Sequence, residues 1–421
     1  MLKVGIVGLG TVGSSVVKIL KENEKIISAR AGVKIFAAIG VARNIEKHKN
    51  LDIPISDNID DILEDESIDL VVELIGGVEQ AYKIVKKALQ KGKSVVTANK
   101  ALLAYHRYEL QELAEGKGFG FEASVAGGIP IIKALREGLS ANKILSIKGI
   151  LNGTCNYMLT KMIEEGVSFS EVLKEAQELG YAEADPTFDV GGFDASHKLL
   201  ILASIAYGID AKPEDILIEG IEGITKEDIF FAKEFGYNIK LLAIAKKSNG
   251  KVELRVHPAL IKKEQMIAKV DGVMNGVSVV GDFVGETLYY GAGAGGDATA
   301  SAVVSDIISI ARGDASPMLG FKKLGSFDHL ALVNADDIKS EYYIRMSVID
   351  EIGVLSKTSS IFAKFGISID SFLQKSSKKQ ERTTLLFSTH KCKESKIKSA
   401  LKHIESLEFV KEPPAMIRIE D

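Results

Sequence analysis

The sequence predicts an α/β protein in three parts: an N-terminal parallel sheet covered by helices, a central α+β domain, and a C-terminal unit with the order βαββαβ. Three observations predict this architecture. Apolar runs alternate with amphipathic segments up to Glu122, a glycine-rich loop joins the first strand to the first helix, and strand and helix patterns follow the βαββαβ order from Glu341 onward.

The N-terminal part reads as a parallel sheet with crossover helices. Apolar, β-rich runs predict strands at residues 3–7, 33–41, 70–74 and 94–98. Amphipathic segments predict helices at residues 12–22 and 81–91. Because strands that alternate with helices form parallel sheets, we expect one such domain over residues 1–130.

The loop after the first strand has the spacing Gly-x-Gly-x-x-Gly and opens a helical pattern, the context of a dinucleotide-binding Rossmann domain. In this motif the glycines permit a tight turn, close approach of the backbone to a pyrophosphate, and close packing of helix on strand. The helix N-terminus offers free N–H groups to the anion. The residues predicted to contact the cofactor are Gly8, Leu9, Gly10, Thr11, Val12 and Gly13. The alternative is an ordinary strand-to-helix turn.

The end of the second predicted strand indicates which dinucleotide is bound. An NAD enzyme usually places an acidic residue here, against the ribose 2′-hydroxyl. The sequence Ile39-Gly-Val-Ala-Arg43 offers none, and the Arg43 guanidinium suits a 2′-phosphate. We therefore favour NADP(H), with NAD(H) possible if Arg43 and the lysines after it only form a solvated helix start.

Composition excludes several classes of function. The 53 basic and 57 acidic side chains give a net charge of -4, which does not favour a nucleic-acid partner. The two cysteines, Cys155 and Cys392, exclude a disulfide framework and a multi-cysteine metal site. The chain has no secretory leader pattern and no apolar run long enough to cross a membrane, so we expect a cytoplasmic protein.

After Glu122 the pattern changes to that of an α+β domain, which we place at residues 131–325. Helical segments are predicted at residues 168–179 and 195–207, and strands at residues 239–245 and 251–256. A second glycine cluster, residues 291–297, opens a long helical pattern. We expect this helix, residues 297–312, to pack back on the N-terminal domain.

Hydride transfer to or from an alcohol needs a group that moves the hydroxyl proton. The seven histidines are scattered along the chain, so lysine is considered next. Asp194 and Lys198 are four residues apart, which places them on one face of a helix. Acidic, glycine-containing loops just upstream suit a substrate with an ammonium group. The alternative is a surface ion pair between Asp194 and Lys198.

With these motifs the chain resembles homoserine dehydrogenase along essentially its whole length. The matching segments are Gly8 to Gly13, Thr97 to Lys100, Glu122 to Pro130, Asn152 to Asn156, Gly180 to Pro186, Asp189 to Lys198 and Gly291 to Asp297. The resemblance implies interconversion of L-homoserine and L-aspartate 4-semialdehyde. It also implies a place in threonine, methionine and isoleucine biosynthesis.

The resemblance also implies roles for individual residues. Lys198 matches the family's proton donor, and Lys100 matches a second lysine beside the reacting oxygen and the cofactor. Glu183 and Asp194 match the carboxylates that hold the substrate amino group. The remaining substrate-site residues are Gly180, through a backbone contact, and Asp189, through support of the site.

Two further contacts follow from the resemblance. A monovalent cation, Na⁺, is implied, bound largely by main-chain oxygens of Glu122, Val125, Gly127 and Ile129. The alternative is a loop that needs glycine only to turn. A second contact with the cofactor is implied at Gly296, at the start of a helix where N–H groups are unpaired. Here the alternative is a simple helix cap.

The C-terminal unit, residues 341–421, has the pattern of a ferredoxin-like fold and resembles an ACT domain. The segment Asp350 to Gly353 lies in the strand-to-helix turn where such modules usually bind an amino acid. We expect feedback control, with threonine as the effector, and a homodimer or homotetramer. The alternative is a dimerisation unit without a ligand.

Two other functions stay open on sequence alone. One is aspartate-semialdehyde dehydrogenase chemistry with Cys155 as the nucleophile, which needs a base beside the thiol. The other is a non-catalytic amino-acid or redox sensor. We do not expect a bifunctional kinase-dehydrogenase, because no kinase domain precedes Met1.

Overall fold

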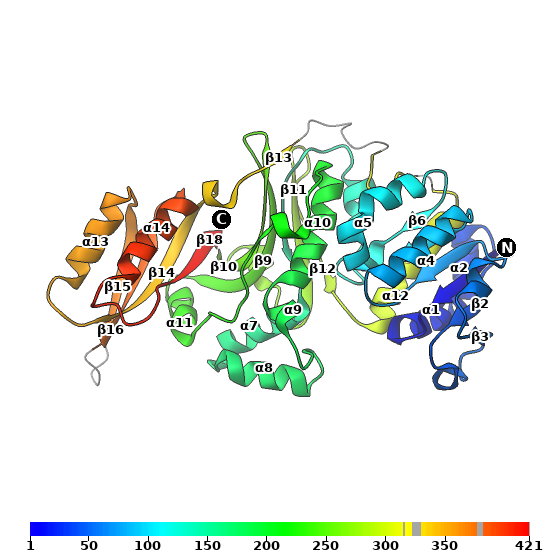
Figure 1. The fold of residues 1–421 in the computed structure, drawn as a ribbon, viewed down its shortest axis with the longest axis horizontal. Coiled ribbons are helices and arrows are strands. Elements are labelled where there is room, and N and C mark those ends of the chain that lie inside the picture. Colours follow the sequence, from blue (N-terminus) through cyan, green and yellow to red (C-terminus); the bar gives the residue numbers. More distant parts are fainter. Residues whose placement is uncertain (315, 322–329, 377–381, 421) are drawn as a thin grey trace.

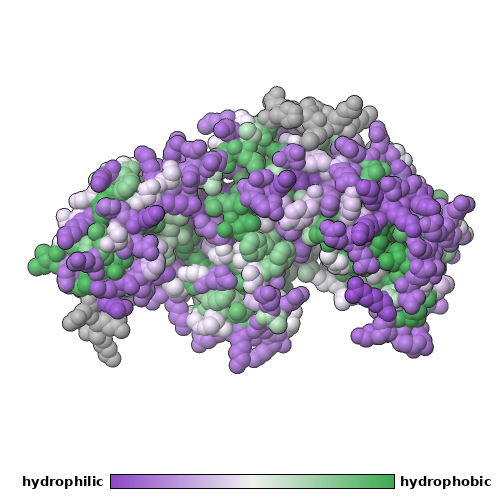
Figure 2. Space-filling model, viewed as in Figure 1, coloured by the Kyte–Doolittle hydropathy of each residue, from purple (hydrophilic) through white to green (hydrophobic). Residues whose placement is uncertain are grey.

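The computed structural model describes residues 1–314, 316–321, 330–376 and 382–420. The predicted fold class is confirmed. The N-terminal sheet and its helices lie at one end of the long axis, the central domain lies in the middle, and the C-terminal unit lies at the other end (Figure 1). Figure 2 shows that the outline of the molecule is notched between the central domain and the N-terminal domain.

The N-terminal domain is a six-stranded parallel sheet with the strand order β3-β2-β1-β4-β5-β6. In that order the strands are Ile55–Ser56, Ile35–Val41, Leu2–Val7, Leu70–Glu73, Ser94–Thr97 and Phe119–Gly120. The helices of this part are α1 (Thr11–Glu22), α2 (Glu24–Ala31), α3 (Asp60–Leu63), α4 (Glu79–Gln90) and α5 (Lys100–Leu113). The order reverses beside β1, where open α/β sheets bind their ligands.

Successive residues of each strand point to opposite faces of this sheet. Ile6 and Val72 pack with α1, α2 and α12 (Gly296–Ala311), whereas Val7 and Val71 pack with α4 and α5. Strands buried on both faces have continuous apolar sequences. The helix α12 thus returns to the N-terminal domain after the chain has built the central domain (Figure 1).

The central domain contributes an antiparallel run of strands in the order β12-β11-β7-β9-β10. These strands are Gly285–Ala292, Met274–Gly281, Ile144–Ile150, Tyr237–Ser248 and Lys251–Lys262. Its helices are α6 (Ile131–Lys133), α7 (Gly153–Glu165), α8 (Phe169–Glu178), α9 (Thr187–Val190), α10 (Phe193–Tyr207) and α11 (Lys226–Glu234). Two short strands, β8 (Leu217–Ile218) and β13 (Ala331–Leu332), pair with β10.

Helix α10 is the central support of this domain. It packs against β7, β9 and β10, and nearly all of its residues are buried, most of them apolar. Strands β9 and β10 form a long hairpin whose two turn residues, Asn249 and Gly250, have φ values of 48° and 76°. Positive φ at both positions is what a two-residue hairpin turn requires. Strands β7, β11 and β12 were not predicted.

The C-terminal unit has the predicted βαββαβ order. Its elements are β14 (Lys339–Ile349), α13 (Val354–Lys364), β15 (Ile369–Ser376), β16 (Arg382–Thr389), β17 (Cys392–Lys393), α14 (Glu394–Glu405) and β18 (Ala415–Glu420). Strand order β18-β14-β16-β15 matches a ferredoxin-like sheet, and Ile344, Phe362, Phe387 and Ile397 build its core.

The strands of the central domain and those of the C-terminal unit form one continuous sheet, which the sequence did not predict. Strand β18 pairs with β14 on one side and runs parallel to β10 on the other, with Ala259 opposite Arg418. The C-terminal unit is therefore joined to the central domain by backbone hydrogen bonds. The upper limit expected for the central domain, residue 325, lies outside the described residues. Within the described ranges no helix is both long and apolar enough to span a membrane.

Candidate active site

The glycine-rich loop leaves the backbone open above the start of α1. Gly8 has φ of 101°, and a Cβ there would lie 2.8 Å from the Leu74 carbonyl oxygen. A Cβ on Gly13 would lie 2.0 Å from the Gly8 carbonyl oxygen, so a side chain is excluded. A Cβ on Gly10 would meet nothing within 4 Å. The residues present therefore fit a pyrophosphate over the helix start.

Two helices begin side by side at this position. A Cβ on Gly296, the first residue of α12, would lie 2.9 Å from Thr11 Cγ2, at the first residue of α1. Neither helix receives a side-chain cap hydrogen bond at its start. Lys18 and Asp297 join the two helices in an ion pair of 3.1 Å. Two sets of unpaired N–H groups thus face one region, which favours an anion.

Arg43 lies two residues after Val41, the last residue of β2, and is exposed. In the part of the chain that the structure describes, no carboxylate lies within ion-pair distance of it. The nearby Lys49 is paired with Glu46 at 2.5 Å. Arg43 is therefore the guanidinium at the carboxyl end of β2 that remains open to a ligand.

The predicted Asp194 and Lys198 do form an ion pair, but not on the surface. Asp194 is 2% exposed, and its Oδ2 lies 2.8 Å from Lys198 Nζ, four residues later on α10. Asp194 Oδ1 forms a second ion pair with Lys100, the first residue of α5. The surface alternative is therefore wrong. One buried carboxylate holds two ammonium groups that come from two domains.

Burial and the charge of the ion-pair partner act in opposite directions on the pKa values of Asp194 and Lys198. Burial would raise the pKa of Asp194, but the neighbouring Lys198 and Lys100 outweigh it and hold that pKa well below its usual range. Burial lowers the pKa of Lys198, and the like charge of Lys100 adds to this, while Asp194 opposes both. A lysine with a lowered pKa is suited to proton transfer.

Asn152 connects the carboxylates of this site. Its Nδ2 donates to Asp189 Oδ1 at 2.7 Å and to Asp194 Oδ2 at 2.9 Å, while its Oδ1 accepts from Cys155 N and caps α7. Lys198 Nζ also donates to the carbonyl oxygen of Leu151 at 2.7 Å. Asp189, Asp194 and Lys198 are thus brought together at the start of α7.

The other two predicted substrate residues lie on the loop after α8. Gly180 has φ of 76° and Glu183 is exposed. The loop is attached to the start of α7, because Thr154 Oγ1 donates to the Tyr181 carbonyl oxygen at 2.6 Å. The structure records no contact between the Glu183 carboxylate and the lysines.

A buried carboxylate, Glu73, lies at the carboxyl end of β4. It accepts hydrogen bonds from Thr97 Oγ1 at 2.6 Å and from Ile75 N at 2.8 Å. Thr97 in turn accepts from Asn99 N at 3.0 Å, and Asn99 caps α5 through Leu102 N at 3.0 Å. Burial raises the pKa of Glu73 to about 7. This network fixes the residue before Lys100.

Aromatic side chains surround the same region. His197 is 8% exposed and packs edge-on against Tyr105 and Phe188. Lys100 Nζ lies 5.7 Å from the centre of the Phe188 ring. Burial lowers the pKa of His197, which keeps its imidazole neutral. The scattered histidines therefore include one that borders the site, and its buried Nδ1 has no hydrogen-bond partner.

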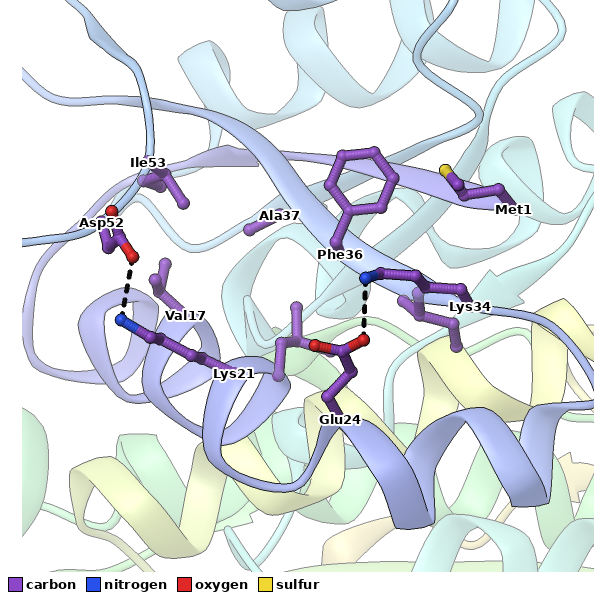
Figure 3. Close-up of a pocket in the computed structure, with 11 residues that line it drawn as sticks. Met1, Val17, Lys21, Glu24, Lys34, Phe36, Ala37, Asp52 and Ile53 are labelled. Carbon is purple, nitrogen blue, oxygen red and sulfur yellow. Dashed lines mark hydrogen bonds and ion pairs between the residues drawn. The ribbon is translucent and has the colours of Figure 1, made fainter.

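A cavity of about 470 Å³ lies elsewhere, between α1 and the start of β2 (Figure 3). Its rim carries two ion pairs of 2.8 Å, Lys21 with Asp52 and Lys34 with Glu24. None of its lining residues belongs to the predicted site. The chemistry predicted above therefore does not take place in this cavity.

Comparison with known proteins agrees with this geometry. The family model described as "Homoserine dehydrogenase, NAD binding domain" matches residues 8–122, "Homoserine dehydrogenase" matches residues 130–308, and "ACT domain" matches residues 342–409. A homoserine dehydrogenase from Helicobacter pylori is 58% identical over 420 residues, which cover 100% of this chain and 99% of the relative. The chain belongs to the homoserine dehydrogenase family.

Solved homoserine dehydrogenases share the fold. The crystal structure from Thiobacillus denitrificans has a TM-score of 0.94 and 45% identity, over 100% of this chain and 98% of that one. A hyperthermophilic archaeal homoserine dehydrogenase in complex with NADPH has a TM-score of 0.63 and 28% identity, over 77% of this chain and 99% of that one. This homoserine dehydrogenase thus carries an NAD-binding domain and an ACT domain.

Cys155 lacks the surroundings of a nucleophile. It is fully buried, and its thiol donates to the Asp189 carbonyl oxygen at 3.2 Å. Burial raises the pKa of this thiol far above its usual range, and the Asp189 and Asp194 charges add to the effect. Because the thiolate is the reactive form, these surroundings do not favour thioester chemistry at Cys155.

The segment expected to bind Na⁺ is buried and rich in backbone strain. Ala126 and Gly127 both have φ of 55°. The Glu122 carboxylate accepts from Ile132 N at 2.7 Å and Lys133 N at 2.9 Å, so it caps α6. Among the described residues no group of three or more His, Cys, Asp or Glu side chains suits a metal.

Sequence reasoning gave no role to Asn152 or Glu73. The signal for Asn152 is present, because asparagine is favoured immediately before a helix and its amide has two donors. Glu73 ends an apolar strand of the predicted sheet, where ligands bind, and that position is the available signal. The side chains that they contact, Asp189 and Asp194 for Asn152 and Thr97 for Glu73, lie far away in the sequence.

Proposed function

We propose that this chain interconverts L-homoserine and L-aspartate 4-semialdehyde with Lys198 as the proton donor. The observation that carries the proposal is the buried cluster in which Asp194 binds Lys198 at 2.8 Å and also pairs with Lys100. Lys100 follows strand β5 of the sheet whose strand β1 leads into the glycine-rich loop, and Lys198 lies on α10 of the central domain. The cluster joins a proton donor to the dinucleotide site.

The nicotinamide ring, when bound, supplies or accepts the hydride. In the reductive direction Lys198 Nζ gives a proton to the substrate oxygen as negative charge develops there, and becomes a neutral amine. In the oxidative direction the neutral amine takes the hydroxyl proton. The lowered pKa of Lys198, caused by burial, makes the neutral amine accessible. Lys100 stabilises the charge on the same oxygen.

The acidic residues hold the amino group of the substrate. Glu183 and Asp194 supply carboxylates, and Gly180 supplies a backbone contact. Asp189 supports the site through the Asn152 amide at 2.7 Å. The exposed position of Glu183 supports a role that is completed when substrate binds. The reaction serves threonine, methionine and isoleucine biosynthesis.

The cofactor is NADP(H) in preference to NAD(H). Arg43 supports this, since it is exposed at the carboxyl end of β2 and a guanidinium forks onto a phosphate. The archaeal relative in complex with NADPH supports it as well. The contacts proposed for the cofactor are Gly8, Leu9, Gly10, Thr11, Val12, Gly13, Arg43, Lys100 and Gly296.

Na⁺ is bound by the main-chain oxygens of Glu122, Val125, Gly127 and Ile129. Within the described ranges no backbone N–H donates to the carbonyl oxygens of Val125 and Gly127, which supports a ligand there. The Ile129 oxygen accepts from Ile131 N at 2.8 Å and has a second lone pair left. Activity compared in sodium and in choline chloride tests this site.

The ACT domain binds threonine at the turn after β14 and lowers activity. Gly353 immediately precedes α13 with φ of 90°, and Ile352 is fully exposed in the same turn. The chain forms a homodimer or homotetramer. Phe283 and Tyr290, exposed on and before the edge strand β12, support contact with a second copy.

The experiment that tests the function is homoserine oxidation with NADP⁺ and with NAD⁺, each with and without threonine. Turnover with homoserine supports the proposed reaction, faster turnover with NADP⁺ supports the cofactor preference, and a lower rate with threonine supports inhibition through the ACT domain. A chain ending at Asp336 is a poor control, because removal of β18 exposes the edge of β10. Methionine and isoleucine, added to the full chain, are better controls for the effector.

A further inference from the structure

We propose that Arg418, on the last strand of the C-terminal unit, is a positioning residue for the Asp194–Lys198 pair and acts through Glu219. The inference rests on the proposed role of that pair in catalysis. It is carried by a chain of contacts from β18 to the first turn of α10. Arg418 itself touches neither Asp194 nor Lys198.

Arg418 is fully buried and makes a forked contact with the partly exposed Glu219 across the boundary between the two units. Its Nη1 and Nη2 donate to the Glu219 carboxylate at 2.7 and 2.8 Å, and Nη2 also pairs with Glu394 at the start of α14. Tyr342 of β14 donates to the same Glu394 carboxylate at 2.8 Å. Bidentate guanidinium contacts fix direction as well as distance. Glu219 is thereby tied to two strands and a helix of the C-terminal unit.

Glu219 lies within reach of Arg418 because two strands share one edge of β10. Strand β8 pairs with β10 up to Ile218 opposite Val256, and β18 begins its pairing at Ala259. Glu219 follows β8 directly, and its N–H donates to the Val256 carbonyl oxygen at 2.8 Å. The side chain of Glu219 therefore spans the short gap between the end of β8 and the side chain of Arg418.

The segment after Glu219 supports the turn that starts α10. Ile221 N donates to the Val190 carbonyl oxygen at 2.9 Å. A Cβ on Gly220 would lie 2.5 Å from that oxygen and 2.9 Å from Gly191 Cα, so the two backbones are in close contact. A Cβ on Gly192 would lie 3.6 Å from the Glu219 carbonyl oxygen. Any shift of Glu219 is passed to this turn.

The turn in question sets the position of the catalytic carboxylate. Val190 ends α9, which carries Asp189, and Gly192 precedes α10 with φ of 87°. Asp194 is the second residue of α10 and Lys198 lies one turn later. Misplacing a reacting group by 1 Å costs on the order of a hundredfold in rate. The C-terminal unit thus influences the rate without touching the substrate.

The test compares Glu219→Ala and Glu219→Gln with Arg345→Gln in the full-length enzyme. Arg345 of β14 makes another ion pair between the units, at 2.8 Å to Asp228 on α11, away from the turn. We expect Glu219→Ala to lower kcat about tenfold with an unchanged KM for cofactor, by the positional argument above. Glu219→Gln, which keeps one acceptor for Arg418, should fall between this variant and the wild type.

Arg345→Gln should lower the melting temperature but keep kcat within about twofold, because it leaves the turn in place. The inference is overturned if Glu219→Ala keeps the wild-type kcat, or if Arg345→Gln loses as much kcat. If Glu219→Ala does not fold, Glu219→Gln is used instead, and a wild-type kcat in Glu219→Gln overturns the inference. Lys198→Met is measured in the same assay, and near-normal turnover in that variant contradicts the proposed function instead.

Discussion

Lys198 Nζ lies 2.8 Å from Asp194 Oδ2, and both groups are buried on the first turns of α10. The other oxygen of Asp194 pairs with Lys100 from the N-terminal domain. A carboxylate between two ammonium groups compensates their charges and fixes the distance between them. This relationship is the basis of the proposed chemistry.

Replacement of Asp194 should change both the rate and its pH dependence. Asp194→Asn removes the charge that opposes the fall in the Lys198 pKa, so that pKa should fall further. Reduction needs protonated Lys198 and is lost as pH rises through its pKa, so the loss should occur at lower pH in the variant. We expect kcat to fall on the order of a hundredfold or more. The measurement is the pH profile of aldehyde reduction.

Asp60→Asn is the control for Asp194→Asn, because Asp60 also lies in the first turn of a helix and pairs with a lysine, but is exposed. It should leave the pH profile unchanged. An Asp194→Asn profile that coincides with the wild type would contradict the role of Asp194.

Reversal of the charge at Arg43 should weaken the preference for NADP⁺. Arg43→Glu places a carboxylate where the 2′-phosphate is expected, and loss of a charge-assisted contact costs about 1.5–3 kcal/mol. The ratio of kcat/KM for NADP⁺ to that for NAD⁺ should therefore fall roughly 10- to 100-fold. Arg30→Glu, an equal charge change at an exposed position on α2, should leave the ratio unchanged. Equal ratios in the two variants would remove Arg43 from this role.

Glu73 should make the folded protein less stable as pH rises toward neutrality. Burial raises its pKa to about 7. An acid whose pKa is raised on folding contributes most stability below its unfolded pKa of about 4.3, and that contribution is lost as pH rises through about 7. Glu73→Gln has no such titration, so its unfolding free energy should fall less between pH 5 and 8, by up to roughly 3 kcal/mol.

The measurement for Glu73 is urea unfolding of both proteins at several pH values. Glu122, whose pKa burial also raises to about 7, is present in both and cancels in the difference. Unfolding curves whose pH dependence is the same in wild type and Glu73→Gln would contradict the account of Glu73.

Local patterns predicted the parts of this protein that depend on neighbours in sequence. The Gly8 to Gly13 loop, the helix with Asp194 and Lys198 four residues apart, and the βαββαβ order all follow from short-range periodicity. The hairpin of β9 and β10 also has its signal in sequence, in Asn249 and Gly250.

Contacts between distant segments could not be predicted in this way. Spacing alone favoured a surface pair for Asp194 and Lys198, although the apolar run at residues 199–203 indicates a buried helix. The strands that cover α10, which are β7, β9 and β10, cannot be read from local sequence. The ion pair of Lys100 with Asp194 joins residues from two domains. The pairing of β18 with β10 likewise needs both sheets in place, because a strand edge does not specify its partner.

Cys155→Ser should leave turnover within about threefold of the wild type. A serine hydroxyl can donate to the Asp189 carbonyl oxygen as the thiol does at 3.2 Å, and the volume change is small. The measurement is kcat for homoserine oxidation, with aldehyde oxidation in the presence of phosphate assayed in parallel. Loss of both activities in a folded Cys155→Ser protein would favour the nucleophile alternative.

The most direct test of the central claim is the rate of homoserine oxidation by Lys198→Met with saturating NADP⁺, beside Lys161→Met. Lys161 also pairs with a carboxylate four residues away on a helix, at 2.6 Å to Glu165, but at the surface of α7. We predict that Lys198→Met loses on the order of a thousandfold in kcat, binds cofactor with unchanged affinity, and that Lys161→Met equals the wild type. Near-normal turnover by Lys198→Met would contradict its role as the proton donor.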